Sequence, residues 1–264
     1  MTTTKARLHR RPAVVNDLTG RADIMIMKDL AQPSFLQTTR VRPSMPPSAV
    51  LIAFDGVLAD TENYHVAAWQ RTLARLGWDV PDDVAARSAE IDDSLFAAEI
   101  FAHRGIVQAD IDGWVRRKQA LTLEMIRSAP RLFPGAADLV KSLAGHARLV
   151  VVADSLRDHV EALLERSGLA DRIELIVAAD DVKAVRPEPD GLRLAIKRLK
   201  VAAGHVLAIE GTPAGLRAAR AAGISCMAVG HRRPFGEWVG DAPYVSGFEP
   251  VSGILAQLGF SREP

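Results

Sequence analysis

The alternation of short apolar runs with longer amphipathic stretches constrains the fold more than any other feature of the sequence. It begins at Ala49 and continues through most of the remaining chain. Apolar runs without polar alternation are typical of strands that are buried on both faces of a parallel sheet. Amphipathic helices between such strands cover the two faces. The pattern therefore predicts an α/β fold with a parallel sheet.

The order of the expected elements places a long helical segment directly after the first strand. Beyond that segment strands and helices alternate regularly, so we interpret the segment as a helical cap inserted into the core. We expect a core of residues 49–62 and 129–264 and a cap of residues 63–128. The expected strands are Ala49 to Phe54, Arg148 to Ala153, Glu174 to Ala178, His205 to Ile209 and Ile224 to Val229, and the expected cap helices are Glu62 to Leu76, Asp93 to His103 and Ile111 to Ser128.

Two helices of the expected core have recognisable first residues. Ser155 precedes an apolar helical face and has a side chain suited to an N-cap, so we expect it to cap the helix after the second strand. Thr212 followed by Pro213 predicts a second helix start, and Gly223 predicts the end of that helix.

Residues 1–48 differ in composition from the rest of the chain. They contain eight Lys or Arg and three Asp, whereas the remainder contains 25 basic and 29 acidic residues. They end in a stretch rich in Pro and Ser that is unsuited to regular structure. We expect a flexible basic extension, with docking on an acidic protein partner as the alternative. The lack of interleaved aromatic residues argues against nucleic acid binding.

Cysteine content and hydropathy indicate the compartment. The single cysteine, Cys226, excludes an intramolecular disulfide and a cysteine-rich zinc site. No apolar run reaches the roughly 18 residues of a membrane span, and the N-terminus lacks the order of a secretory signal. We therefore expect a cytoplasmic protein that does not cross a membrane.

In an open parallel sheet the ligand site lies at the carboxyl ends of the strands. Four segments occupy that edge in the predicted fold. They are Ala53 to Asp60, Ala153 to Ser155, Asp180 to Arg186 and Glu210 to Thr212.

These segments resemble the four motifs of the haloacid dehalogenase (HAD) superfamily, in the branch with a helical cap that includes β-phosphoglucomutases and phosphoglycolate phosphatases. The resemblance covers about residues 49 to 260 and implies a Rossmann-like, HAD-like core with an inserted helical cap. It rests on Phe54-Asp55-Gly56-Val57-Leu58-Ala59-Asp60-Thr61-Glu62 with His65, Ala68 and Trp69, on Phe133-Pro134-Gly135, on Arg186-Pro187-Glu188-Pro189-Asp190 and on Glu210-Gly211-Thr212-Pro213-Ala214-Gly215.

The resemblance assigns the nucleophile of phosphoryl transfer to a position that here holds Ala53. In the family a carboxylate at this position attacks phosphorus and forms an aspartyl-phosphate. Alanine has no atom that can do so. Asp55 is retained at the acid/base position, where the family's aspartate protonates the leaving oxygen and its backbone carbonyl helps to hold magnesium.

Two further positions depart from the family pattern. The second motif has Ala153 where a Ser or Thr hydroxyl is expected, and we interpret the nearby Ser155 as a helix cap rather than a shifted substitute. The third motif has Arg186 in place of a lysine, which keeps a cation but changes its shape. We expect Lys183 to be solvated.

The metal ligands implied by the resemblance are incomplete. The fourth motif has Glu210 followed by Gly211, so the carboxylates expected at 53 and 211 are both missing. Magnesium would be left with Asp55, water and Glu210, and we expect weak or no binding because it requires near-octahedral oxygen coordination. We therefore expect no cofactor, or Mg²⁺ if activity remains. In the cap, Ile91 occupies the place of a substrate-binding arginine in the segment Ser88 to Ile91.

Two functional hypotheses follow from these departures. The first is a catalytically degenerate HAD-like protein that acts by binding a partner or small ligand. The alternative is a Mg²⁺-dependent phosphatase or phosphoglucomutase-like hydrolase with weak or atypical activity, in which Asp55 activates water.

The remaining charges and rings of the site allow competing interpretations. We predict that Arg186 pairs with Asp55 or Glu210 as a counter-charge, although an exposed Arg186 on a loop is equally compatible with the sequence. His65 and Trp69 either face the cleft or pack between cap and core. Asp180 and Asp181 are expected to be solvated or to cap their loop.

Overall fold

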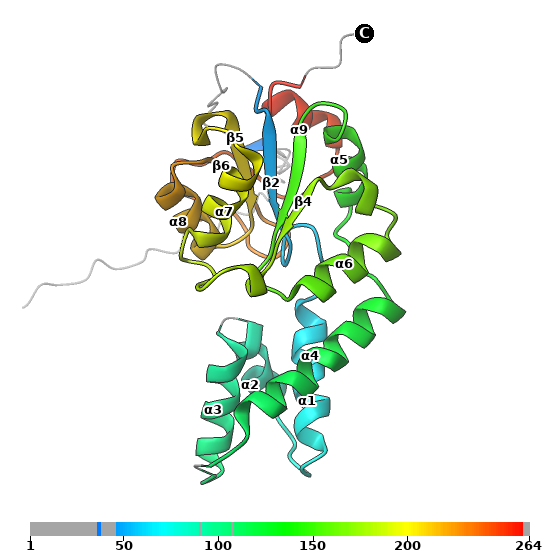
Figure 1. Ribbon diagram of the computed structural model, residues 1–264, viewed down its shortest axis with the longest axis vertical. Helices are drawn as coiled ribbons and strands as arrows, with labels where there is room; N and C mark the ends of the chain where they lie inside the picture. Colours follow the sequence, from blue (N-terminus) through cyan, green and yellow to red (C-terminus); the bar gives the residue numbers. More distant parts are fainter. Residues whose placement is uncertain (1–35, 38–45, 90, 107, 261–264) are drawn as a thin grey trace, which may run out of the picture. The chain divides into compact units, whose positions relative to one another are not determined.

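A computed structural model describes residues 36–37, 46–89, 91–106 and 108–260. Within these residues a seven-stranded sheet has the order β1-β7-β6-β5-β2-β3-β4, and β2 to β7 run parallel (Figure 1). This confirms the predicted α/β class with a parallel sheet. The strands are β1 (Leu36–Gln37), β2 (Ala49–Ala53), β3 (Arg148–Val152), β4 (Leu175–Val177), β5 (Val206–Glu210), β6 (Ser225–Val229) and β7 (Tyr244–Val245).

The side chains of the central strands alternate between two apolar layers, as the pleat requires. Ile52 of β2 lies in the layer that α5, α6 and α9 cover, and Leu51 lies in the layer that α7 and α8 cover. Because both faces are buried, nearly every position of these strands is apolar. The covering helices are α5 (Ala136–Leu143), α6 (Arg157–Arg166), α7 (Asp190–Leu199), α8 (Pro213–Ala222) and α9 (Val251–Gln257).

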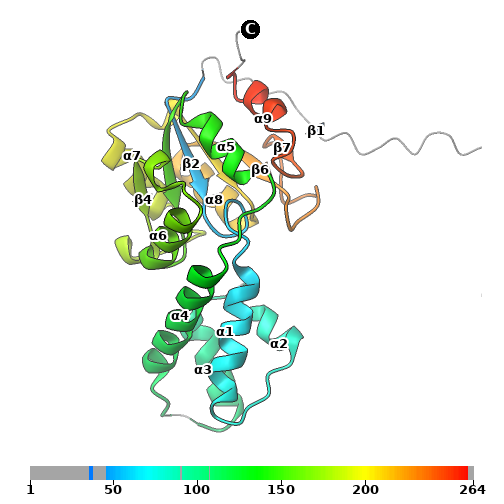
Figure 2. The same cartoon turned by 90° about the vertical axis from the view of Figure 1, so that its right-hand side faces the viewer.

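Helices α1 to α4 form a group of their own next to the sheet (Figure 2), and their side chains pack in an apolar cluster that includes Trp69 and Phe96. Helix α4 contacts α1 and α3, and it also contacts α6 of the core. The predicted bounds of α3 and α4 are correct, whereas α2 was not expected because five residues show no clear periodicity. The helices are α1 (Glu62–Ala74), α2 (Asp82–Ala86), α3 (Asp93–His103) and α4 (Ile111–Ser128), and the short 3₁₀ turns are Arg87–Ala89, Ala170–Arg172, Ala179–Asp181 and Ala203–His205.

Among the described helices, none combines the length with the apolar composition that a membrane span requires.

The two predicted helix starts have different outcomes. The Thr212 side chain accepts a hydrogen bond from the Gly215 N–H, Pro213 opens α8, and Gly223 ends it in a left-handed conformation, as predicted. The prediction for Ser155 is wrong. The N-cap of α6 is Leu156, without a side-chain cap, and the Ser155 hydroxyl bonds elsewhere.

Most of the predicted N-terminal extension, residues 1–48, lies outside the described residues. Within it, Leu36–Gln37 form β1, which pairs antiparallel with β7 through Leu36 opposite Val245. Ser48 also joins the core, since its N–H donates to the His205 carbonyl. Strand pairing of β1 was not expected, because a two-residue strand leaves no alternating pattern in the sequence.

Candidate functional site

The end of β2 carries no nucleophilic side chain. Ala53 is its last residue, is 5% exposed, and lies in register with Val152 of β3. The chain then turns through Gly56, which has a positive φ of 76°, and the Gly56 N–H donates to the Ala59 carbonyl. This turn presents the Asp55 side chain beyond the strand end.

The Asp55 carboxylate accepts two short hydrogen bonds from hydroxyl groups. Thr61 Oγ1 donates to Oδ1 at 2.6 Å, and Ser155 Oγ donates to Oδ2 at 2.6 Å. Ser155 therefore belongs to the site and does not cap α6, which corrects the sequence interpretation. The hydroxyl comes from the end of β3, the position that parallel strands bring beside β2. His65 Nε2 lies 4.0 Å from Asp55 Oδ1.

Arg186 is buried in an ion-pair cluster at the same edge of the sheet. Its Nη2 lies 2.9 Å from Glu210 Oε1, its Nε lies 3.1 Å from Oε2, and its Nη1 lies 2.8 Å from Asp154 Oδ1. The Nη2 group also donates to the Val152 carbonyl. The predicted pairing of Arg186 with a carboxylate is thus confirmed, and the partner is Glu210.

The Arg186 and Glu210 side chains are only 9% and 2% exposed. Burial lowers the pKa of Arg186, but the charges of Glu210 and Asp154 more than offset this and raise that pKa above its usual range. The guanidinium therefore stays charged. Each of its three nitrogens has an oxygen partner, and of its five N–H groups only the second one on Nη1 has no partner among the described residues.

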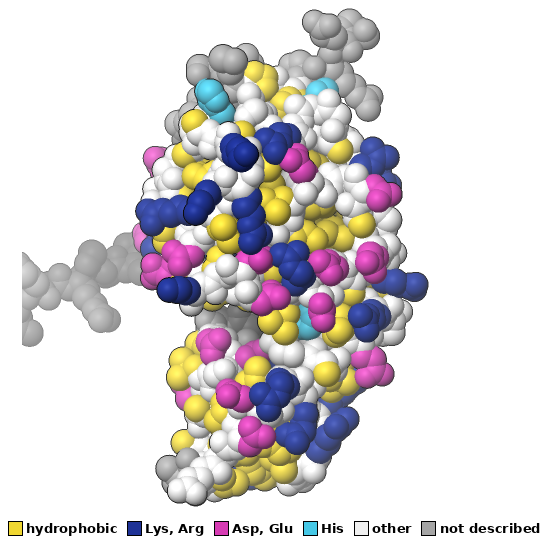
Figure 3. Space-filling model, in the orientation of Figure 1, with side chains coloured by type: hydrophobic (Ala, Val, Ile, Leu, Met, Phe, Trp, Pro, Cys, Tyr) yellow, Lys and Arg dark blue, Asp and Glu magenta, His cyan; other side chains and the backbone are white. Residues whose placement is uncertain are grey.

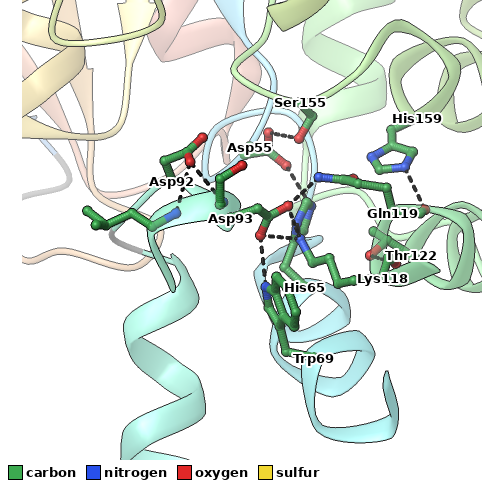
Figure 4. A network of polar contacts seen from close by, with 12 residues as sticks. Asp55, His65, Trp69, Asp92, Asp93, Lys118, Gln119, Thr122, Ser155 and His159 are labelled. Atoms are coloured by element: carbon green, nitrogen blue, oxygen red, sulfur yellow. Dashed lines mark hydrogen bonds and ion pairs between the residues drawn. The ribbon is translucent and has the colours of Figure 1, made fainter. Parts of the chain in front are cut away.

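The cap contributes a buried lysine that the sequence analysis did not single out. Lys118 of α4 is fully buried, and its Nζ lies 2.8 Å from both carboxylate oxygens of Asp93 and 2.7 Å from His65 Nδ1 (Figure 4). Asp93 also accepts hydrogen bonds from Trp69 Nε1 at 2.8 Å and from Gln119 Nε2. We call these five residues, His65, Trp69, Asp93, Lys118 and Gln119, the cap network.

The lysine fixes the tautomer of His65. An ammonium group has only donors, so we assign His65 Nδ1 as the acceptor and place the proton on Nε2, which faces Asp55. Burial, followed by the nearby Lys118 charge, lowers the pKa of His65 to about 3. The imidazole is therefore neutral at pH 7. Its Nε2–H group can donate a hydrogen bond toward Asp55 or toward a group bound beside it.

A second histidine lies beside the cap network. His159 of α6 is 1% exposed, its Nε2 is 3.0 Å from the Gln119 carbonyl, and its ring centre is 6.0 Å from that of His65. Burial lowers the pKa of His159, against smaller opposing contributions. Its Nδ1 and His65 Nε2 are buried polar atoms without a hydrogen-bond partner among the described residues. Both are free to bond a polar group that enters between cap and core.

The sequence offered one signal for Lys118. It lies four residues before Thr122 and seven before Met125, on the buried stripe of α4. A lysine on such a stripe requires a buried partner. The sequence could not identify that partner, because Asp93 lies 25 residues away on another helix.

The other candidate residues have structural positions. Asp180 accepts the Arg157 N–H, and Asp181 accepts the Ala178 N–H and pairs with Arg157, so both organise their loop. Lys183 is exposed, as expected. Ile91 packs against the cap cluster around Trp69.

The residues at the sheet edge do not fit the magnesium site that the family resemblance implied. Asp55 is bonded to two hydroxyls and Glu210 is paired with Arg186, so the two predicted residual ligands have other partners. The fourth-motif carboxylate is also excluded by space. A Cβ atom at Gly211 would lie 2.9 Å from Val57 Cγ2 and 3.0 Å from the Gly56 carbonyl oxygen. We therefore derive no step through a metal ion.

The space between the sheet and α3 forms a hollow on the molecular surface, and acidic side chains line both of its sides (Figure 3). The cations of the candidate site do not offset this charge for a ligand, since Arg186 and Lys118 are both paired with carboxylates.

Comparison with known proteins decides the family. The model of the haloacid dehalogenase-like hydrolase family matches residues 50–229. The chain belongs to this family. The fructose-1-phosphate phosphatase YqaB of Escherichia coli is 31% identical over 69% of this chain and 96% of its own length. The phosphoglycolate phosphatase of Rhodospirillum rubrum is 29% identical over 82% of this chain and 92% of its own length.

Solved structures of family members agree with the fold. CbbY from Rhodobacter sphaeroides, in complex with phosphate, superposes with a TM-score of 0.71 at 28% identity and covers 81% of this chain and 99% of its own. A putative β-phosphoglucomutase from Thermotoga maritima shares the fold with a TM-score of 0.67 at 21% identity. The resemblance and the HAD-like fold inferred from the motifs are thus confirmed.

Proposed function

We propose that this member of the haloacid dehalogenase-like hydrolase family does not transfer phosphoryl groups and acts by binding a partner or a small ligand. The observation that carries the proposal is Ala53 at the end of β2, two residues before the retained Asp55. Loss of a nucleophile alone typically lowers turnover by many orders of magnitude, and further losses then add little.

The charges around Ala53 support the same proposal. Phosphoryl transfer requires free positive charge to stabilise the oxygens of the transition state. Here the only cation from the third motif, Arg186, is held by Glu210 and Asp154. The charges of Arg186, Glu210 and Asp154 therefore neutralise one another rather than the charge of a bound phosphate.

Weak phosphatase activity is the second candidate, and the names of the relatives favour it. YqaB and the Rhodospirillum rubrum protein are both called phosphatases. In this alternative Asp55 would activate water directly. Its carboxylate already accepts two hydroxyl hydrogen bonds, which stabilise the ionised form but occupy both oxygens.

A phosphatase assay separates the two candidates. The full-length protein would be incubated with Mg²⁺ and with fructose 1-phosphate, phosphoglycolate and xylulose 1,5-bisphosphate, and released phosphate would be measured. We expect the same rate as in an Asp55→Asn variant. Turnover that Asp55→Asn abolishes would reject the proposal in favour of the weak enzyme.

A binding assay tests the second half of the proposal. We expect native mass spectrometry of the purified full-length chain to detect a retained small molecule that is lost in a His65→Leu variant. For a protein partner, we expect affinity capture by the full chain but not by a chain without residues 1–34, which leaves β1 in place. If neither a retained small molecule nor a captured protein partner were found, the proposal that the chain acts by binding would be rejected.

We also propose a cytoplasmic location. The single cysteine, Cys226, supports it, because the chain has no intramolecular disulfide that would require an oxidising compartment. Fractionation of the source cells with an antibody against the chain would test it, and recovery in a membrane or secreted fraction would refute it.

A further inference from the structure

The two segments that connect the core to the cap lie side by side. The first segment runs through Asp60 into α1, and the second returns from α4 through Arg131. The Asp60 N–H donates to the Arg131 carbonyl at 3.0 Å, and Ala59 forms an antiparallel bridge with Leu132. Tyr64 Oη adds a bond of 2.5 Å to the Ala129 carbonyl. Any rotation of the cap must therefore bend both segments together.

A third segment, the loop after β6, binds both connections through one side chain. Arg232 of this loop pairs with Asp60 on the outgoing segment, and its Nε lies 2.9 Å from Glu62 Oε2 at the first residue of α1. Its guanidinium carbon lies 5.7 Å from the ring centre of Phe133 on the returning segment. Asp60 also accepts Arg131 Nη2 at 3.2 Å. One arginine thus contacts both connections and the cap itself.

The residue before Arg232 attaches the loop to the core. The His231 ring stacks on Phe133 at 4.2 Å with an interplanar angle of 1°, and it meets Phe248 edge-on at 4.7 Å. Burial lowers the pKa of His231 to about 4, so the stacked ring is neutral at pH 7. A neutral ring between two phenylalanines keeps the loop in place while Arg232 reaches outward.

We infer that His231 and Arg232 form a hinge clamp that holds the cap in the position where His65 faces Asp55. Glu62 is the first residue of the cap helix α1, one residue before the cap boundary expected from the sequence, so it moves with the cap, whereas the loop after β6 moves with the core. A rotation of the cap away from the sheet therefore breaks the pair between Arg232 and Glu62. Arg232 is a positioning residue, since it acts on the site through the connections and touches none of the site's polar groups.

The geometry distinguishes this clamp from an ordinary surface ion pair. Exposed pairs contribute little to stability because both side chains remain solvated and mobile. Asp60 is only 17% exposed and joins two arginines, one from the returning connection and one from the loop after β6. Networks of this kind fix the relative orientation of the segments that they join, because the planar guanidinium bonds in defined directions.

The distance between cap and core tests the inference. Spin labels would be placed at Leu95→Cys on α3 and Lys197→Cys on α7, both exposed, with Cys226→Ala to remove the native thiol. Pulsed electron paramagnetic resonance of the full chain would give the distribution of distances between the two spin labels. We expect a narrow distribution with Arg232, and in Arg232→Ala a distribution roughly twofold broader with a longer mean distance.

The neighbouring arginine provides the matched control. Arg233 is exposed and makes no ion pair with any described residue, so Arg233→Ala should leave the distribution unchanged. Glu62→Gln, which removes one partner and keeps the shape, should broaden it less than Arg232→Ala. It also serves if Arg232→Ala fails to fold. Equal distributions for the native chain, Arg232→Ala and Glu62→Gln would overturn the inference, as would equal broadening by Arg233→Ala.

Discussion

Two buried cations, Arg186 in the core and Lys118 in the cap, have different surroundings. Arg186 is bonded to two carboxylates and a backbone carbonyl, and all of these groups belong to strand ends of the sheet. Lys118 is bonded to one carboxylate and to His65, whose other nitrogen faces Asp55.

The difference shows which half of the site still has a polar group available for a ligand. On the core side the cation and its carboxylates satisfy one another, so this part of the sheet edge is closed. On the cap side the lysine satisfies one nitrogen of His65 and leaves the other free. A ligand would therefore be recognised by the cap network and Asp55 rather than by the strand ends that hold the nucleophile and metal in the family.

The largest effect is expected when the cap cation loses its carboxylate. Asp93→Ala removes the counter-ion of the fully buried Lys118, which must then either carry an unpaired charge or lose its proton. We expect a loss of about 4 kcal/mol in the free energy of unfolding, measured by urea denaturation.

The adjacent carboxylate is the matched control for Asp93. Asp92 accepts the N–H groups of Ser94 and Leu95 as the N-cap of α3. Asp92→Ala should cost about 1 kcal/mol, as loss of a cap does. Equal losses for the two variants would show that the cap network contributes no more than a helix cap.

A smaller loss is expected in the core, because Arg186 has two carboxylate partners. Glu210→Ala leaves Asp154, which is 41% exposed, as the remaining counter-charge. We expect a loss of about 3 kcal/mol. The double variant Arg186→Met with Glu210→Leu should lose less than Glu210→Ala, since no buried charge is left unpaired. A double loss equal to the sum of the single losses would contradict a mutually compensating pair.

Acid should destabilise the cap through His65. The folded-state pKa of His65, about 3, lies below the ordinary value of 6.5, so the unfolded chain binds the proton more readily. Its contribution is complete above pH 6.5 and is lost progressively as the pH falls toward 3. At pH 5 the loss is about 2 kcal/mol relative to pH 7. Urea denaturation at pH 7 and pH 5 should show this loss in the free energy of unfolding, and the loss should be smaller in His65→Gln. If His65→Gln showed the same pH dependence as the native chain, the lowered pKa of His65 would be refuted.

The smallest effect concerns space at the fourth motif. Gly211→Ala places a Cβ atom against Val57 and the Gly56 carbonyl, and we expect a loss of about 1 to 2 kcal/mol. Gly204 has nothing within 4 Å of an added Cβ, so Gly204→Ala should change the free energy of unfolding by less than about 0.5 kcal/mol. Similar results for both would show that the turn at Gly56 can move to admit a larger residue.

The sequence predicted the parts of the site that depend on strand order. Parallel strands end at one edge, so Ala53, Asp55, Arg186 and Glu210 could be expected together there. The pair of Arg186 with Glu210 followed from charge balance, since a cation beside retained carboxylates without a metal requires a partner.

The sequence did not predict the hydrogen-bond partners of flexible hydroxyl and ammonium groups. Ser155 has equally suitable local and distant partners, and only the fold shows that its hydroxyl reaches Asp55, 100 residues earlier. The pairing of Lys118 with Asp93 depends on how two cap helices pack. Strands β1 and β7 were missed because two residues form no alternating pattern.

The dependence of thermal stability on Mg²⁺ tests most directly the central claim that Arg186 has replaced a metal as the counter-charge of this site. A ligand that binds only the folded state raises the melting temperature, and the rise grows with the logarithm of its concentration once this exceeds the dissociation constant. For the full-length protein we predict no rise from zero to roughly 10 mM MgCl₂ beyond that caused by NaCl at equal ionic strength. A saturable rise with Mg²⁺ that is lost in both Asp55→Asn and Glu210→Gln would contradict the account.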